Sequence, residues 1–164
     1  MKSIRYLFLA ATLTVPLVLP VSAMADGGTY VTGSAKVAVG GYDAVSYFRG
    51  NGTPAKGDAR FKVTYRGALW HFSSQANADA FKANPTAFAP QYGGHCSWAI
   101  AQGYLAPGDP TAYDIVDGKL YLNYDQGIRA KWRKNISGFI AKGGPNWAKI
   151  PAGKTYGGSS WFGS

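Results

Sequence analysis

The fold is decided by residues 61–72, which read FKVTYRGALWHF. Aromatic and aliphatic residues alternate with polar ones on both sides of Arg66-Gly67, a pattern typical of two antiparallel strands joined by a two-residue turn. The expected cross-strand pairs are Tyr65 with Ala68, Val63 with Trp70, and Phe61 with Phe72. All six residues then share one face of the hairpin, which we expect to be buried, while His71 points to the other face.

Short elements of both kinds follow this hairpin. We expect a helix that is capped by Ser73 or Ser74 and stopped by Asn84-Pro85, followed by a short helix that begins at Pro85. A third helix is expected over residues 95–102, with Gly103 as its C-terminal cap. A second hairpin over residues 113–123, with its turn at Asp117-Gly118, and a final helix capped by Asp125 complete the set. The predicted class is α+β, with small antiparallel hairpins packed against several short helices in a single domain.

The first 25 residues have the composition of an export signal. Lys2 and Arg5 precede an uncharged run over residues 6–21, and Ala23-Met24-Ala25 then gives a small-x-small cleavage pattern. The run is shorter than a membrane span and two prolines interrupt it, which argues against a transmembrane anchor. We therefore expect cleavage near Ala25 and an exported protein, periplasmic or secreted.

The rest of the chain divides into three stretches. We expect a flexible lead-in over residues 26–36, one domain over 37–150, and a loose Gly/Ser-rich tail over 151–164. The 22 glycines and 9 prolines follow no repeat period and fit turns between short elements. The net charge of +9 is spread along the chain. Since an exported protein seldom meets nucleic acid, we expect no nucleic-acid partner.

The reactive residue types are few, and their scarcity excludes several classes of protein. The chain has one cysteine and two histidines, and its eight acidic residues are all aspartates. A single cysteine forms no disulfide within the chain and no multi-cysteine zinc motif. The absence of glutamate removes the HExxH metalloprotease pattern and any glutamate-based acid/base pair.

Five ordered segments carry a family resemblance: VGGYDAVSYF at 39–48, YRGALWHF at 65–72, APQYGGHC at 89–96, GYLAPGDP at 103–110 and VDGKLYLNY at 116–124. Together they resemble the YHS domain family, in its exported, signal-peptide-bearing subgroup, over about residues 37–150. The resemblance implies a small heavy-metal-associated module.

The sequence departs from the metal-binding pattern that the resemblance implies. Metal-binding versions carry a cysteine directly after the aromatic strand and another four positions later, and Ser73 and Asn77 stand at these places here. Both are poor ligands for soft metals. The family's early cysteine is also missing, with Gly40-Gly41 in that region. What the exported subgroup keeps is a lone cysteine after Tyr-Gly-Gly, here Cys96.

The functional expectation therefore depends on Cys96. It opens a predicted helix, whose free N–H groups and dipole can stabilise a thiolate and lower the pKa of the thiol. The alternative is a small buried side chain with an inert thiol. Together with His95 and His71 it forms our candidate ligand set for copper or zinc. Because His95 and Cys96 are adjacent, their side chains should diverge.

Glycine-rich turns with nearby aromatic residues indicate a second kind of site. The candidates for a pocket that takes a small ligand or glycan are Tyr42, Asp43, Tyr92, Gly93, Gly94 and Trp98.

These observations lead to one functional expectation and two alternatives. We expect a monomeric exported module that binds a soft metal ion, or an envelope protein as redox partner, through Cys96. A structural or small-ligand-binding domain with a buried inert cysteine is the alternative. A thiol-dependent enzyme is third, because no base is placed beside the thiol and no CxxC pattern is present.

Overall fold

A computed structural model of the chain describes residues 37–49, 51–151, 154 and 156. The predicted signal peptide at 1–25, the lead-in at 26–36 and most of the predicted tail at 151–164 lie outside the described residues. The described part contains two antiparallel hairpins and several helices in a single domain, so the expected α+β class is confirmed. No helix in this part is long and apolar enough to cross a membrane.

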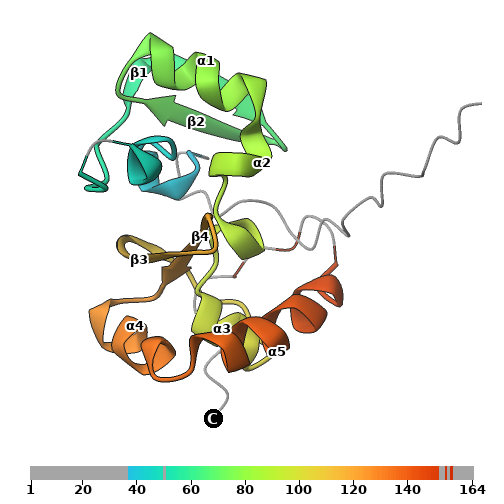
Figure 1. Cartoon of the computed structure of the whole chain (residues 1–164). Helices are drawn as coiled ribbons and strands as arrows, with labels where there is room; N and C mark the ends of the chain where they lie inside the picture. The colour runs from blue at the N-terminus through green and yellow to red at the C-terminus, as the bar shows by residue number, and fades with distance from the viewer. Residues whose placement is uncertain (1–36, 50, 152–153, 155, 157–164) are drawn as a thin grey trace, which may run out of the picture.

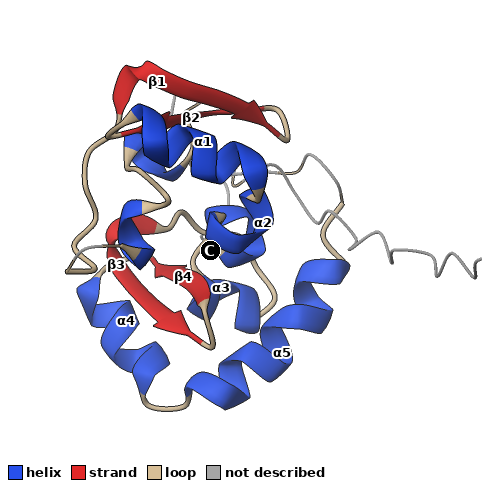
Figure 2. Cartoon of the chain, turned by 45° about the horizontal axis from the view of Figure 1, so that its top comes forward, coloured by secondary structure: helices blue, strands red, loops and turns tan. Residues whose placement is uncertain are grey.

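The elements form two layers that lie one above the other in Figure 1. The first layer contains the 3-10 turns η1 (Val39–Gly41) and η2 (Ser46–Phe48), the hairpin of β1 (Asp58–Tyr65) and β2 (Ala68–Phe72), and helices α1 (Gln75–Ala83) and α2 (Pro85–Phe88). The second layer contains η3 (Gln91–Gly94), α3 (Ser97–Ala101), the hairpin of β3 (Asp109–Val116) and β4 (Lys119–Asn123), α4 (Gln126–Arg133) and α5 (Ile136–Ala148). Figure 2 shows α1 lying along the first hairpin and α4 beside the second.

The first hairpin has two of the three predicted cross-strand pairs, Val63 with Trp70 and Tyr65 with Ala68. The third prediction was wrong, because Phe72 pairs with Asp58 and not with Phe61. The Asp58 carboxylate accepts a hydrogen bond from the Arg60 N–H at 2.8 Å. This local turn competes with the ladder and bulges the start of β1, which shifts the register.

The two layers repeat one arrangement that the sequence pattern did not reveal. In each, an eight-residue strand and a five-residue strand are joined by a two-residue turn with positive φ at both positions. Each longer strand is irregular after its first residue, Asp58 or Asp109. Asp109 stands 51 residues after Asp58, as Trp132 does after Phe81, and both of these aromatic side chains are fully buried. Most residues at matching positions of the two layers differ in type. The layers therefore repeat a backbone conformation and not a sequence.

Two hydrophobic clusters fill the layers. The first contains Trp70 and Phe81, whose ring centroids are 4.7 Å apart, and the second contains Tyr121 and Trp132 at 5.5 Å. Leu122, the residue after Tyr121 in β4, belongs to the first cluster. Because successive residues of a strand point to opposite faces, β4 is packed on both sides and joins the two layers.

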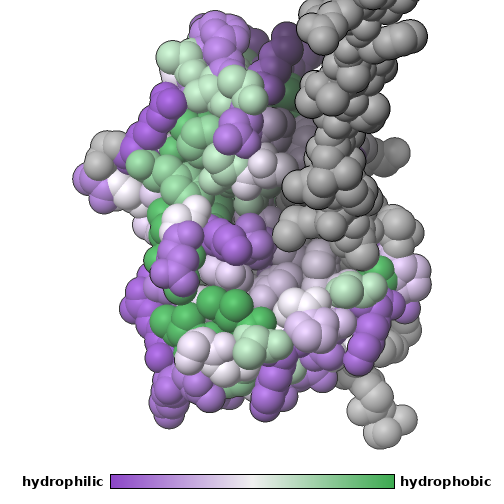
Figure 3. All heavy atoms as spheres, turned by 45° about the vertical axis from the view of Figure 1, so that its right-hand side comes forward, coloured by the Kyte–Doolittle hydropathy of each residue, from purple (hydrophilic) through white to green (hydrophobic). Residues whose placement is uncertain are grey.

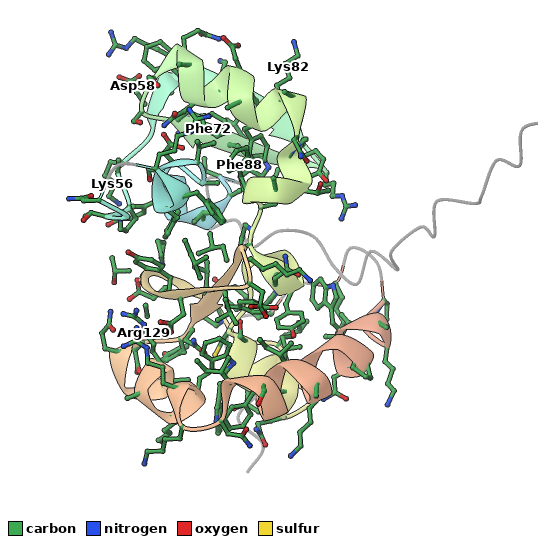
Figure 4. The ribbon with its side chains drawn as sticks, in the orientation of Figure 1. Lys56, Asp58, Phe72, Lys82, Phe88 and Arg129 are labelled. Carbon is green, nitrogen blue, oxygen red and sulfur yellow. The ribbon has the colours of Figure 1, made fainter. Side chains whose placement is uncertain are left out.

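Apart from the buried Asp43, the charged side chains of the described residues lie at or near the surface. Figure 4 shows Lys56 and Lys82 pointing away from the first layer, while Phe72 and Phe88 lie inside it. On the face shown in Figure 3, hydrophilic residues are scattered over both layers between apolar ones. The hydrophilic residues do not form one continuous block on that face.

Helix α5 closes the second layer by docking on η3. Trp147 packs against Tyr92 and His95, with ring centroids 6.2 and 5.6 Å apart, and so docks the C-terminal part of the described chain on η3. Tyr156, within the stretch predicted as a tail, packs against the same cluster. Gly143 of α5 faces Tyr92 so closely that a Cβ at this position would lie 2.5 Å from the Tyr92 hydroxyl oxygen.

Replacing Gly143 by Ala should therefore destabilise the protein by about 1–3 kcal/mol, because the added methyl group overpacks the contact with Tyr92. The matched control is Gly144→Ala in the same helix, where a Cβ meets nothing within 4 Å, and its effect should stay within about 0.5 kcal/mol. Denaturant unfolding measures both. Equal effects of the two substitutions would contradict this packing.

Candidate functional site

Asp43 is fully buried between η1, η2 and the start of α1. Its Oδ1 accepts hydrogen bonds from the backbone N–H groups of Val45 and Ser46 at 2.8 and 3.3 Å. Its Oδ2 accepts from the N–H and hydroxyl of Ser73 at 2.9 and 2.6 Å and from Asn77 Nδ2 at 2.7 Å. Five donors thus converge on one carboxylate and occupy its lone pairs. We call this group the Asp43 cradle.

The Asp43 cradle includes the two positions where the family resemblance places cysteines in metal-binding versions. Ser73 and Asn77 stand there, and both donate hydrogen bonds to Asp43. Asn77 Oδ1 in turn accepts from Arg49 Nη1 at 3.0 Å. Ser73 and Asn77 therefore present hydrogen-bond donors to the Asp43 carboxylate, whereas a metal ion must be bound by atoms with free electron pairs. These residues do not fit the metal site of the family.

Cys96 occupies the N-cap position of α3 in the second layer, and its side chain is 1% exposed. The Cys96 side chain makes no capping hydrogen bond to α3, and the Trp98 N–H donates to Asn123 Oδ1 at 3.3 Å. The backbone N–H groups of Ala99, Tyr124 and Trp98 nevertheless act to lower the pKa of the thiol. The Asn123 carboxamide lies alongside, with Oδ1 3.9 Å from Cys96 Sγ. We call this second group the Cys96 cradle.

Burial raises the pKa of the Cys96 thiol, although the three N–H groups act in the opposite direction. The helix expected over residues 95–102 begins only at Ser97 and has five residues. The expectation that this helix end lowers the pKa was wrong, because desolvation of the charged form outweighs the N–H groups. In the free protein Cys96 is therefore a neutral thiol at neutral pH.

His95 is fully buried and packs against a different set of residues from Cys96. Its Nδ1 lies 2.9 Å from the Tyr92 carbonyl oxygen, and its ring packs against Trp147 and Tyr156 at centroid distances of 5.6 and 6.3 Å. The expected divergence of the two side chains is confirmed. Burial lowers the pKa of His95 despite the hydrogen bond to the Tyr92 carbonyl, which leaves a neutral imidazole whose Nε2 has no partner among the described residues.

His71 lies on β2 in the first layer, away from α3 in Figure 1. It is half-buried, and Gly57 packs on its backbone so closely that a Cβ at Gly57 would lie 2.5 Å from the His71 carbonyl carbon. Within residues 37–49 and 51–151, no three His, Cys or Asp side chains are close enough together to hold a metal ion. The structure does not bring Cys96, His95 and His71 together as one ligand set.

The six pocket candidates are divided between the layers. Tyr42 is half-buried beneath Lys56, whose Nζ lies 3.8 Å from its ring centroid, and the neighbouring Asp43 is taken up by its cradle. Tyr92, Gly93 and Gly94 are buried. Burial also raises the pKa of Tyr92, as expected for a hydroxyl enclosed by packing. Of the six, only Trp98 is a partly exposed side chain beside Cys96.

Two buried polar residues near Cys96, Asn123 beside its sulfur and Ser97 next to it in sequence, were missed from the sequence. Asn123 and Ser97 are 0% and 1% exposed, and Asn123 Nδ2 and Ser97 Oγ have no hydrogen-bond partner among the described residues. Asn123 ends β4 as Phe72 ends β2. The signal available in the sequence was a polar residue, Asn123, at the strand end where the first hairpin has the buried Phe72.

Replacing Asp43 by Asn should destabilise the protein by about 3 kcal/mol, because an amide NH₂ then faces N–H and O–H donors in a buried site. The matched control is Asp79→Asn, an exposed residue of α1, which should have little effect. Chemical denaturation of both variants at neutral pH measures the difference. If Asp43→Asn unfolds at the wild-type denaturant concentration, the cradle does not stabilise the first layer.

The comparisons with known proteins bear on the first layer. The sequence model of the YHS domain family matches residues 50–92, well under half of the chain. No curated protein and no solved structure matches the chain. The matched residues include both strands of the first hairpin and α1, and they end before Cys96. The match supports the YHS domain resemblance for this part of the chain.

Proposed function

We propose that this protein is an exported, non-catalytic binding module of the YHS type that takes one soft metal ion at Cys96. The observation that carries the proposal is the buried free thiol of Cys96, whose sulfur lies 3.9 Å from Asn123 Oδ1. The backbone N–H groups of Ala99, Tyr124 and Trp98 act to lower the pKa of this thiol. A soft metal ion displaces the thiol proton, since the thiolate is the metal ligand. The same N–H groups then stabilise the negative charge on the sulfur.

The donor set favours Cu(I) over zinc. Structural zinc sites take four nitrogen and sulfur ligands, and the described residues offer one thiol with no histidine beside it. Cu(I) is soft and accepts a lower coordination number. Both methionines, Met1 and Met24, precede the proposed cleavage site. A further ligand therefore comes from outside the chain, from a small thiol or a partner protein of the cell envelope.

Export is part of the proposal and is supported by the N-terminal pattern. The charged start at Lys2 and Arg5, the uncharged run over residues 6–21 and the Ala23-Met24-Ala25 pattern form the three parts of a secretory signal. A chain with only one cysteine also suits an oxidising compartment, because it cannot form an incorrect disulfide within itself.

Catalysis by Cys96 has no support in the geometry. Cysteine nucleophiles need a base within hydrogen-bond reach. Among the described residues, the neutral side chain of Asn123 lies beside the sulfur, while His95 is engaged with Tyr92 and Trp147.

The second candidate function is a structural or small-ligand-binding domain with an inert thiol. The 1% exposure of Cys96 favours it, because a buried neutral thiol behaves as a small apolar side chain. The two candidates differ in metal stoichiometry and in the accessibility of the thiol.

Anaerobic titration of the purified protein with Cu(I), in competition with a coloured Cu(I) chelator, should give one ion per chain. Cys96→Ser should lose this ion, and His71→Ala should keep it as the matched control. Unchanged stoichiometry in Cys96→Ser would refute Cys96 as the ligand. No bound copper, together with no reaction of the folded protein with a thiol reagent, would establish the second candidate instead.

The copper affinity should also depend on pH. Because burial raises the pKa of the Cys96 thiol, the proton is bound throughout the neutral range and must leave when the metal binds. The apparent affinity should therefore rise about tenfold per pH unit up to the thiol pKa, as measured by the same competition at several pH values. An affinity that does not change with pH would show that no thiol proton is displaced.

A further inference from the structure

Basic residues occur all along the chain, but the acidic residues that balance them do not. Residues 37–125 contain seven basic and seven acidic residues, whereas residues 126–151 contain six basic residues and no acidic one. The six lie in or directly after α4 and α5: Arg129, Lys131, Arg133, Lys134, Lys142 and Lys149. The positive excess of residues 37–151 is therefore concentrated on the last two helices.

The two arginines of α4 are used by the fold. Asp114 of β3 accepts hydrogen bonds from Nε and Nη2 of Arg129, each at 3.0 Å, and from Nε of Arg133 at 2.9 Å. This shared carboxylate holds α4 on the second hairpin and balances one of the two positive charges. The arginines therefore have a structural role.

The four lysines have no such role. Lys131, Lys134, Lys142 and Lys149 are exposed, and within residues 37–49 and 51–151 none of them has an ion pair or a side-chain hydrogen bond. The helix dipole favours a lysine near the C-terminal end of a helix, but Lys142 lies in the middle of α5. Lys131 and Lys134 are three positions apart and repel each other, with no acidic residue in either helix. The packing of the domain does not account for these charges.

The lysines lie on the outward sides of two neighbouring helices. Lys142 and Lys149 are seven positions apart, so they share one side of α5, about 10 Å apart along its axis. Gly143 and Trp147 pack on η3 from another side of this helix. Helices α4 and α5 contact each other and form the end of the molecule that lies away from the first layer (Figure 1). We call the surface that carries the four lysines the α4–α5 face.

Two aromatic side chains lie at the edge of the α4–α5 face. Nζ of Lys131 lies over the ring of Trp98, 6.0 Å from its centroid, and Trp98 meets Tyr104 edge-on at a centroid distance of 6.3 Å. Both rings are half-buried. Partly exposed tryptophan and tyrosine rings beside lysines are typical of protein surfaces at the boundary between lipid headgroups and water.

We propose that the α4–α5 face is a docking surface for a membrane that contains anionic phospholipid. Each lysine close to a negatively charged bilayer strengthens binding about fivefold. Lys142 and Lys149 are separated by about one Debye length at 0.1 M salt, so they act on the same part of the bilayer. A lysine carries a point charge that needs no fixed geometry, which suits a surface of many phosphates.

Two observations favour a bilayer over a nucleic acid. Arginine is the side chain that binds phosphate bidentately, and both arginines of α4 are engaged with Asp114. The export proposed above would also place the face beside a membrane and away from nucleic acid. No helix in the described part of the chain is long and apolar enough to enter the bilayer, so this docking is electrostatic and reversible. The first layer then points away from the membrane (Figure 1).

Sedimentation with lipid vesicles tests the proposal on the purified protein in its processed form. The protein should sediment with vesicles of phosphatidylcholine and phosphatidylglycerol, and not with vesicles of phosphatidylcholine alone. Binding should be lost as the salt concentration approaches about 1 M, where the Debye length falls to about 3 Å. Equal binding to both kinds of vesicle, or binding that salt does not weaken, would contradict docking by charge.

A matched pair of double variants locates the docking surface. Lys142→Gln combined with Lys149→Gln removes two charges from the α4–α5 face and should weaken binding about twentyfold. Lys62→Gln combined with Lys82→Gln removes the same charge from exposed positions of the first layer, and Lys82 lies at the opposite end of the molecule (Figure 4). This control should bind within about twofold of the unmodified protein, because salt screens charges that lie beyond a Debye length. Equal losses in the two variants would show that net charge drives binding, and the assignment of the α4–α5 face would be wrong.

Two further measurements separate this inference from the other proposals. Cys96→Ser should bind the anionic vesicles as tightly as the unmodified protein, so loss of the proposed metal site and loss of docking are distinguishable. A DNA oligonucleotide, added in competition, should bind more weakly than the vesicles. If the oligonucleotide binds more tightly and releases the protein from the vesicles, the α4–α5 face recognises a polyanionic polymer and the membrane proposal is overturned.

Discussion

The carboxylate of Asp43 holds together three parts of the first layer that are distant in sequence. It ties the turn at η2 to the end of β2 and the first turn of α1 through five hydrogen bonds. A fully buried carboxylate is tolerated only when donors replace its lost hydration. The positions of Ser73 and Asn77 are therefore fixed by this charge, and the hairpin and α1 that they flank pack on the cluster of Trp70 and Phe81.

The second layer uses the same backbone construction for a different chemical purpose. Its turn, bulged hairpin and capped helix follow those of the first layer, and Asp125 caps α4 as Ser74 caps α1. Cys96, however, stands where the first layer has Asp43. Most side chains differ between the layers, and the replacement of a carboxylate by a thiol at this position is the difference on which the proposed function rests.

The YHS match and the candidate functional residue lie in different layers. Residues 50–92 carry the match, yet the serine and asparagine at the family's cysteine positions are engaged with an anion. Function cannot be transferred from those positions, because hydrogen-bond donors and metal ligands have opposite polarity. The sole thiol of the chain lies beyond the match, in a layer whose similarity to the first is structural.

The sequence by itself determined the local elements. The alternation over 61–72, the Asp117-Gly118 turn, the Asp125 cap and Pro85 at a helix start all act between near neighbours, so their outcome follows from the residues present. The tertiary structure alone decided the bulge at Asp58, the separation of His71 from Cys96, and the raised pKa of the thiol. It also decided that Asn123 lies beside Cys96 Sγ. These depend on burial and on groups brought together from distant parts of the chain, which no local pattern specifies.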